Sequence, residues 1–315
     1  MGKVGTPDKQ PVALIAGPTA SGKSDLAVSL ALALEKRGKR AVVINADSAQ
    51  VYADLQILSA RPTAEDMRGV EHRLFGAWDG ARACSAAQWA DAAKAEIESL
   101  HAEGAVPILC GGTGMYLQVL VEGIAEIPAI DPGIRDEVRR LSTAKAYLAL
   151  QEEDPERAAE LNPADSQRIS RSLEVVRSTG VTIGDWQKDK EGGIGDEIDL
   201  HPLIMLPDRE WLYERCDMRF EIMLDTGAVE EVETLLERGL PDSLPVMRAI
   251  GVPEISAMQK GELSREEAIA AGQQATRNYA KRQYTWFRRQ PPEDWPKIES
   301  QEYNIDIHFA SLLQH

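Results

Sequence analysis

The fold is decided at residues 17–24, which read Gly17-Pro18-Thr19-Ala20-Ser21-Gly22-Lys23-Ser24. This stretch matches the phosphate-loop pattern G-x-x-x-x-G-K-[S/T] at every fixed position. The apolar run at residues 12–16 predicts a strand before it, and Leu26, Leu30 and Leu34 recur at helical spacing after it. A strand, this loop and a helix form the context in which the pattern binds phosphate, because backbone N–H groups and the helix N-terminus face the anion.

Two residues of the loop carry predicted roles of their own. Lys23 supplies a mobile positive charge, and Ser24 is placed to ligate Mg²⁺. The alternative is a glycine-rich turn without a ligand. The pattern does not distinguish ATP or another nucleotide from other phosphate esters, because backbone donors meet similar oxygen arrays in all of them.

Further strands and helices predict a parallel sheet. Residues 40–45 and 106–110 are β-branched or apolar runs, and residues 86–100 form an amphipathic pattern with Ser85 as N-cap. Strands that alternate with helices favour a parallel sheet with helices on both faces. The expected fold class is α/β, with a P-loop NTPase-like parallel sheet core flanked by helices and an all-helical insertion domain.

The insertion is predicted from a change of character after residue 122. Asp131-Pro132, Asp154-Pro155 and Asn162-Pro163 punctuate short helices, and residues 188–199 suggest a flexible loop. A core strand returns at residues 203–206, and a long final helix is expected at 264–289. We therefore expect a disordered start (1–10), a discontinuous core (11–122 and 200–315) and a helical insertion (123–199).

Asp47 is the candidate general base. It follows a predicted strand, so in a parallel sheet it emerges at the edge that holds the phosphate loop. The alternative is that Asp47 caps a turn before Ser48. Residues 106–110 run into Gly111-Gly112-Thr113 and not into the magnesium-binding Asp of a typical P-loop ATPase, which weakens an ATPase interpretation. Thr113 either points its hydroxyl at a reacting group or caps a helix.

Composition limits the function classes. The 35 Lys and Arg against 51 Asp and Glu give a net charge of -16, so any nucleic-acid contact must be local. Cys84, Cys110 and Cys216 support neither a disulfide framework nor a cysteine zinc site. No apolar stretch approaches the ~18 residues of a membrane helix, and we expect a cytoplasmic protein.

Several stretches together resemble the tRNA dimethylallyltransferase family of bacteria in residues, order and spacing. They are the phosphate loop and the segments Asp47-Ser48-Ala49-Gln50-Val51-Tyr52, Gly111-Gly112-Thr113-Gly114-Met115-Tyr116-Leu117 and Asp165-Ser166-Gln167-Arg168-Ile169-Ser170-Arg171. Further similarity lies at Ala60-Arg61-Pro62-Thr63, at His72-Arg73-Leu74 and at Ala280-Lys281-Arg282-Gln283-Tyr284-Thr285-Trp286-Phe287-Arg288. The resemblance therefore runs from about residue 12 to about residue 290.

The resemblance implies dimethylallyl transfer from dimethylallyl diphosphate to N6 of the adenosine 3′ of the tRNA anticodon, with Mg²⁺ as cofactor. Asp47 matches the general base, Thr113 lies near the reacting centre, and Lys23 acts on the diphosphate. The expected diphosphate site is Gly17, Pro18, Thr19, Ala20, Ser21, Gly22, Lys23, Ser24 and Arg219. The residues expected to contact the tRNA anticodon stem-loop are Asp47, Ser48, Ala49, Gln50, Thr113, Arg135, Gln167, Arg168, Ile169, Ser170, Arg171 and Arg282. A monomer is expected.

Local basic patches make RNA compatible with the acidic chain. On the helix at 264–289, two stripes interleave cations with aromatic rings: Arg277, Lys281, Tyr284 and Arg288 form one, and Tyr279, Arg282, Trp286 and Arg289 the other. The alternative is core aromatics beside a solvated charged face. Arg135, Arg139 and Arg140 add a cluster. Arg215 and Arg219 lie one turn apart as a possible clamp, or else pair with Glu214 and Asp217.

The chain departs from many members of the family at Val252-Pro253, where they carry an aromatic and a basic residue that contact tRNA. The sequence is compatible with two other functions. A small-molecule P-loop kinase would use Asp47 to activate a hydroxyl and the insertion as a lid. A nonenzymatic nucleotide-gated RNA-binding module would hold tRNA and release no diphosphate.

Overall fold

The computed structural model describes residues 9–300 and 302–314. The described residues form two compact units, one on either side of the smaller unit in sequence (residues 9–120 and from 195 onward) and the other from Val121–Ile194. These bounds differ by a few residues from the predicted ones. Residues 1–8 of the expected disordered start lie outside the described residues, and Gln10 already belongs to the first strand.

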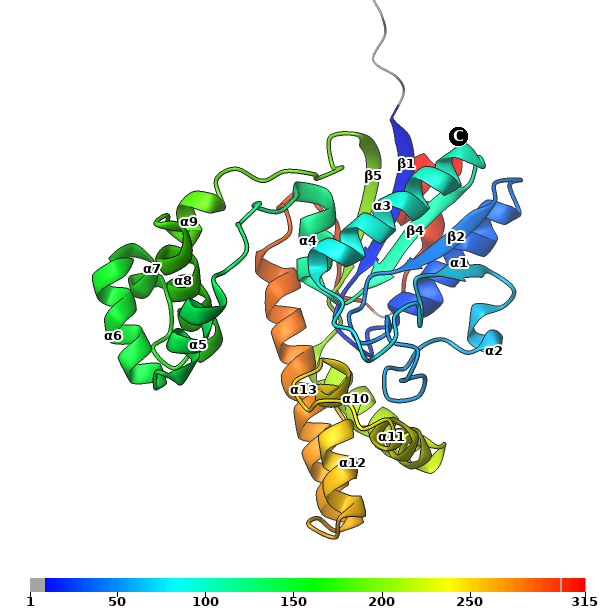
Figure 1. The fold of residues 1–315 in the computed structure, drawn as a ribbon. Helices are drawn as coiled ribbons and strands as arrows, with labels where there is room; N and C mark the ends of the chain where they lie inside the picture. Colours follow the sequence, from blue (N-terminus) through cyan, green and yellow to red (C-terminus); the bar gives the residue numbers. More distant parts are fainter. Residues whose placement is uncertain (1–8, 301, 315) are drawn as a thin grey trace, which may run out of the picture. The chain divides into compact units, whose positions relative to one another are not determined.

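The larger unit is built on a parallel sheet of six strands in the order β3-β2-β4-β1-β5-β6 (Figure 1). The strands are β1 Gln10–Ala16, β2 Ala41–Asn45, β3 Glu71–Arg73, β4 Val106–Gly111, β5 Ile198–Met205 and β6 Lys297–Ile298. The central strands are buried along almost their whole length, as expected for a parallel sheet covered on both faces. The predicted parallel α/β core is confirmed.

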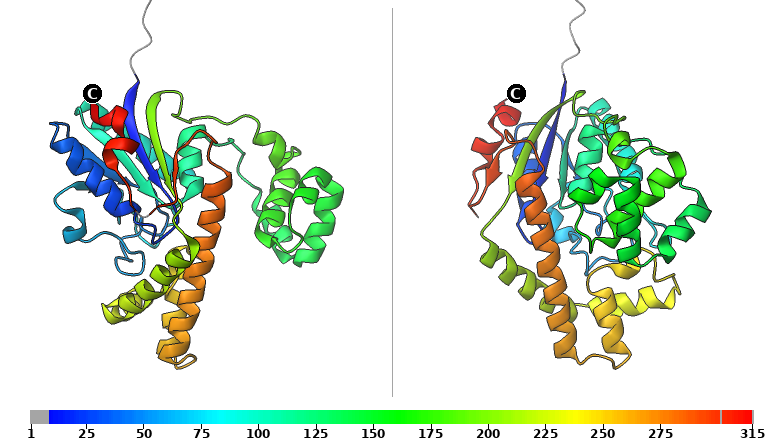
Figure 2. Two further views of the ribbon diagram at one scale, coloured as in Figure 1. Left: turned by 180° about the vertical axis from the view of Figure 1, so that it is seen from behind. Right: turned by 90° about the vertical axis from the view of Figure 1, so that its left-hand side faces the viewer.

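Helices cover the two faces of the sheet. The helix α1 (Lys23–Glu35) packs on one face together with α14 (Ile305–His308) and α15 (Ala310–Gln314), as Figure 2 shows from behind. The helix α3 (Ala86–Ala102) lies on the other face and begins with the predicted Ser85 cap, which forms a capping box with Gln88. The short helices α2 (Ala64–Met67) and α4 (Gly114–Glu122) follow β2 and β4 in the chain.

A second group of helices lies beyond the carboxyl ends of the strands. It comprises α10 (Arg209–Asp225), α11 (Ala228–Glu237), the 3-10 turn Val246–Arg248, α12 (Val252–Gln259) and α13 (Arg265–Arg289). The helices α10 and α13 pack closely. Gly272 of α13 lies so near Phe220 of α10 that a Cβ on it would be 2.0 Å from the ring. The pair lies at the edge of the sheet where the strands end (Figure 1). Its side chains Arg219 and Gln283 contact Thr19 of the phosphate loop.

The smaller unit is a helical bundle with its own core. It contains α5 (Pro132–Arg140), α6 (Thr143–Glu153), α7 (Pro155–Glu160), α8 (Ser166–Thr179) and α9 (Ile183–Trp186). Asp131 and Asp154 cap helices that carry proline at the first position, where the missing N–H costs no hydrogen bond. Val138, Leu150 and Leu173 are fully buried in the core of this bundle.

The structure differs from the sequence-based prediction at four elements, which are β5, α13, β3 and β6. The strand β5 begins at Ile198, inside the predicted 188–199 loop and before the predicted strand at 203–206. The helix at 264–289 is not the final one, because β6, α14 and α15 follow it. The strands β3 and β6 were not predicted, since they are only 3 and 2 residues long and contain charged residues.

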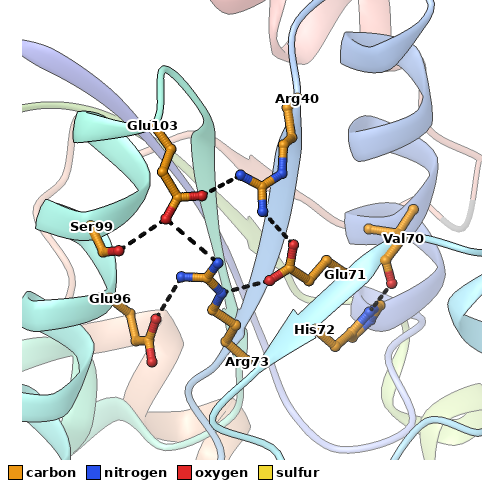
Figure 3. A network of polar contacts seen from close by, with 8 residues as sticks. All are labelled: Arg40, Val70, Glu71, His72, Arg73, Glu96, Ser99 and Glu103. Carbon is orange, nitrogen blue, oxygen red and sulfur yellow. Dashed lines mark hydrogen bonds and ion pairs between the residues drawn. The ribbon is translucent and has the colours of Figure 1, made fainter.

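Ion pairs surround the edge strand β3 (Figure 3). Arg40 binds Glu71 and Glu103, while Arg73 binds Glu71 and Glu96 at 2.8 Å each. These side chains are partly exposed, so water and salt screen the pairs and each contributes little to stability. The charges on β3 therefore suit an edge position, which explains why the strand lacks the apolar pattern of its neighbours.

Within residues 9–300 and 302–314, no helix combines the length and the apolar character that crossing a bilayer requires.

Candidate active site

Three loops meet at the carboxyl edge of the sheet because β2, β4 and β1 are neighbours in it. The backbone N–H of Ala46, after β2, donates to Cys110 O at 2.9 Å, and the N–H of Thr113, after β4, donates to Ala46 O at 3.1 Å. A Cβ at Gly111 would lie 2.1 Å from the Ala46 carbonyl group, so only glycine permits this approach. Asp47, Thr113 and the phosphate loop are thus brought together as predicted.

The phosphate loop has the conformation of an anion-binding nest. Ala20 and Gly22 have φ angles of 63° and 92°, which turn successive N–H groups toward the concave side. The first N–H groups of α1 have no acceptor within the helix. Ser21 Oγ is buried and has no hydrogen-bond partner among the described residues. The loop therefore presents unsatisfied donors that suit phosphate oxygens.

Two cations, the buried Lys23 and the half-buried Arg219, strengthen this preference for an anion. Burial lowers the pKa of Lys23, and the nearby Asp47 carboxylate partly opposes that shift. Burial likewise lowers the pKa of Arg219. The Lys23 ammonium donates to Pro18 O at 3.3 Å, and Arg219 donates to the Thr19 hydroxyl. A bound anion would offset the cost of holding these two charges away from water.

The predicted arginine clamp reaches the loop. Besides the contact of Arg219 with Thr19, Arg215 Nε donates to Ala20 O at 3.1 Å and its guanidinium lies 4.7 Å from the Trp211 ring centre. The alternative partner Asp217 instead accepts from Arg277 at 2.6 Å. The geometry therefore favours the clamp over surface ion pairing.

Asp47 combines the two arrangements weighed from the sequence. Its Oδ1 accepts from the N–H of Ala49 at 3.0 Å, which caps the turn after β2. Its Oδ2 receives no hydrogen bond from the described residues and lies 3.2 Å from the position of a Cβ on Gly112. The residue is 6% exposed. One oxygen thus fixes the carboxylate while the other remains free to accept a proton.

A cluster of hydroxyl groups lies beside Asp47. The Thr113 hydroxyl accepts from the N–H of Ser48 at 2.8 Å and donates to Ser48 Oγ at 3.1 Å, so it is held there and does not cap α4. The Tyr279 hydroxyl, from α13, interacts with both of these side chains, and burial raises the pKa of Tyr279. Tyr279 was predicted only as part of an RNA-binding stripe, and the structure places its hydroxyl in the site.

The site contains two cavities that share Thr19, Asp47 and Arg219. The phosphate chamber has a volume of about 480 Å³ and is lined also by Lys23, Ser24, Gln50, Arg215 and other residues of the loops. The apolar chamber has a volume of about 330 Å³, and its walls include Leu55, Leu58, Phe220, Met223, Tyr279 and Arg282. An anionic group and an apolar or aromatic group can therefore meet beside Asp47.

Gln283 is the site residue that the sequence reasoning missed. Its Oε1 accepts from the N–H of Thr19 at 2.7 Å, and its Nε2 donates to Gly112 O at 2.8 Å. The side chain is 6% exposed and ties α13 to two of the three loops. A signal was present, because Ala280, Gln283 and Phe287 follow at steps of three and four and form a buried face interrupted by one amide.

Gln283→Leu is expected to lower kcat/KM about tenfold or more, because it leaves the Thr19 N–H and the Gly112 carbonyl buried without partners. Steady-state kinetics and thermal unfolding of the variant measure the effect. Gln274→Leu, an exposed position on the same helix, is the control. Equal losses in the two variants would contradict a specific role for Gln283.

The aromatic and basic stripes of α13 divide between core and surface. Trp286 packs on Gly114, where a Cβ would lie 2.3 Å from the ring, and Arg277 is neutralised by Asp217. Arg282 is exposed, lies 5.8 Å from the Tyr279 ring centre and lines the apolar chamber. Among the cations of the two stripes, Arg282 is thus the one that lines the site, next to Tyr279.

In the helical unit, arginines gather around one buried carboxylate. Arg135, Arg139 and Arg171 lie 3.4–4.0 Å from the carboxylate oxygens of Glu174, which leaves an excess of positive charge. Arg168 is exposed, with Asp165 as its neighbour at 3.6 Å. Ile169 was expected to contact tRNA, but its side chain is fully buried in the helical core, because it occupies the inward face of α8.

The described residues contain no group of three or more His, Cys, Asp or Glu side chains that would hold a metal ion. The predicted ligand Ser24 is exposed and lines the phosphate chamber together with Asp25, Glu65 and Asp66. Asp25 already binds Arg68 and the Tyr303 hydroxyl. A cation here would therefore rely on Ser24, the phosphate oxygens of a ligand and water, which is the usual pattern for Mg²⁺.

Comparisons with known proteins agree on one family. The family model "IPP transferase" matches residues 50–290. The tRNA dimethylallyltransferase of Erythrobacter litoralis is 66% identical over 98% of this chain and 97% of its own length. That of Zymomonas mobilis is 52% identical over 98% of this chain and 95% of its own length.

Solved structures give the same result. The tRNA isopentenylpyrophosphate transferase of Bacillus halodurans has a TM-score of 0.66 at 30% identity, with 97% of this chain and 95% of that chain covered. A eukaryotic dimethylallyltransferase solved while acting on tRNA has a TM-score of 0.73 at 28% identity, with coverages of 88% and 69%.

Proposed function

Because this chain belongs to the tRNA dimethylallyltransferase family, we propose that it transfers a dimethylallyl group from dimethylallyl diphosphate to N6 of the adenosine 3′ of the tRNA anticodon. The observation that carries the proposal is the pair of chambers that meet at Asp47, one built for an anion and the other largely apolar. The diphosphate of the donor occupies the phosphate chamber. The adenine and the dimethylallyl group meet beside the Asp47 carboxylate.

The reaction forms a bond between N6 and C1 of the donor and breaks the bond between C1 and the diphosphate oxygen. Diphosphate leaves with the electron pair, and the proton of the amine passes to Asp47 Oδ2. Negative charge grows on the leaving group, where Lys23, Arg219 and the loop N–H groups are already aimed. No described residue donates a hydrogen bond to Asp47 Oδ2, which supports the role of this oxygen as proton acceptor.

We propose Mg²⁺ as the cofactor, held by Ser24 and the donor's diphosphate. When bound, it neutralises charge on the leaving diphosphate. Ser24 is an exposed residue that lines the phosphate chamber, which supports this assignment. The residues proposed to bind the donor and the adenine all belong to one chain, so the proposed reaction needs no second copy. We propose a monomer that acts on tRNA in the cytoplasm.

The helical unit is proposed to contact the tRNA anticodon stem-loop through the exposed arginines of α5 and α8. The cluster keeps a net positive charge in an acidic chain, because three arginines, Arg135, Arg139 and Arg171, surround the single negative charge of Glu174. The exposed face of Arg168 adds to it. These contacts also explain how a chain of net charge -16 binds a polyanion.

Arg168→Ala is expected to weaken tRNA binding, because one phosphate contact is lost. The slope of log Kd against log salt concentration should fall by about 1. Filter binding across a salt series measures this slope. Lys145→Ala, which removes an exposed cation from α6 of the same unit, is the control. A slope for Arg168→Ala equal to that of the wild type would remove Arg168 from the interface.

The test of the function mixes the protein with Mg²⁺, labelled dimethylallyl diphosphate and tRNA that lacks the modification. Label is expected in adenosine, with release of diphosphate and no requirement for ATP. A kinase would instead need ATP and release ADP, and a binding module would leave the donor intact. Label that stays in the donor while tRNA binds would overturn the proposed function.

A further inference from the structure

The turn at residues 55–60, here called the 55–60 wall, borders both chambers. Leu55, Leu58 and Ser59 line the apolar chamber, while Ala60 lines the phosphate chamber. The wall belongs to no helix or strand, so regular secondary structure does not fix its position. Its placement sets the space available beside Asp47.

One carboxylate accepts hydrogen bonds from three consecutive backbone N–H groups of this wall. Glu231, on α11, accepts from the N–H of Gln56 and of Ile57 (2.8 Å) through Oε1 and from the N–H of Leu58 at 2.9 Å through Oε2. Hydrogen bonds from backbone N–H groups to a carboxylate are shorter and stronger than neutral ones. Three successive N–H groups converge in this way only when the backbone curls around the acceptor, so Glu231 specifies the shape of the turn.

Neighbouring contacts show that the wall has little freedom to shift against these helices. A Cβ at Gly227, at the start of α11, would lie 3.0 Å from Ile57, and a Cβ at Gly251 would lie 2.5 Å from Leu58. At the other end of α11, Arg238 binds Asp54, directly before the wall. The helix α11 thus holds the wall at its start and along its backbone.

We propose that Glu231 is a positioning residue for the transfer reaction, since it holds the 55–60 wall in the shape that lets donor and adenine approach Asp47 together. This inference rests on the proposed function. Glu231 touches no reacting atom and acts through Leu55, Leu58 and Ser59 on the apolar side and through Ala60 on the phosphate side. Its loss is expected to affect substrate affinity more than the chemical step.

The experiment compares Glu231→Gln with Glu233→Gln, which neutralises an exposed glutamate on the same helix. Amide hydrogen exchange at residues 56–58 is expected to speed up about tenfold or more in Glu231→Gln, because charged acceptors are lost locally. Exchange in β1 and β4 should stay as in the wild type. The KM for dimethylallyl diphosphate is expected to rise about tenfold, with a smaller fall in kcat.

Unchanged exchange at residues 56–58, or an unchanged KM, would overturn the proposal. If β1 and β4 lose protection as well, the same measurements on Glu231→Asp decide, since that variant keeps the charge with a shorter reach. In Glu231→Asp, faster exchange confined to residues 56–58 together with a raised KM would support the proposal. A general loss of protection in that variant would overturn it. A wild-type protein that transfers no label would count against the proposed function alone, because the exchange measurement needs no substrate.

Discussion

Asp47→Asn is expected to slow dimethylallyl transfer by about two orders of magnitude or more while donor and tRNA still bind. The amide oxygen can keep the hydrogen bond that Asp47 Oδ1 accepts from the N–H of Ala49, so the turn after β2 should remain in place. The amide nitrogen in the place of Oδ2 cannot accept a proton from the amine. The variant therefore removes the base and leaves the turn that lines the site in place.

Single-turnover rates with labelled donor measure the chemical step, and binding of the anticodon stem-loop shows that the substrate site survives. Asp91→Asn, on the exposed side of α3, is the matched control. Turnover of Asp47→Asn equal to that of the control would remove Asp47 as the base. Loss of tRNA binding in parallel with the rate would instead assign Asp47 a binding role.

The core of the fold could be predicted because its signals are local. The apolar strands around β1 and the glycine-containing loop after it each lie within one short stretch of sequence. The strand β3 escaped prediction because Glu71 and Arg73 are charged and gain their partners, Arg40, Glu96 and Glu103, only when the chain has folded. A short edge strand carries too few residues for a periodic pattern.

Some residues of the site could likewise be predicted from local motifs, and others could not. Asp47 and Lys23 follow directly from motifs, whereas Gln283 is separated from Thr19 by 264 positions and Glu231 from Gln56 by 175. Nothing in a single sequence says which polar side chain of a helix will meet a loop so distant along the chain. The same limit left open whether the cations of α13 are free, since the answer for Arg277 depends on Asp217 in α10.

The second large effect is expected for Lys23→Met, which should lower kcat/KM by about two to three orders of magnitude. Methionine keeps the length and the apolar stem of the side chain but removes the charge aimed at the leaving diphosphate. Because burial already lowers the pKa of Lys23, its charge is costly to the free protein. The thermal stability of the free variant should therefore equal or exceed that of the wild type, so a loss of activity cannot be attributed to unfolding.

Inorganic diphosphate with Mg²⁺ separates binding from folding in this experiment. It should raise the Tm of the wild type, since a ligand that binds only the folded state stabilises it, and should raise that of Lys23→Met much less. Lys36→Met, at the exposed end of α1, should respond as the wild type does. An equal rise in Lys23→Met would mean that the backbone donors and Arg219 suffice to hold the anion. The charge of Lys23 would then act only as the bond to diphosphate breaks, and the variant would lose kcat with KM unchanged.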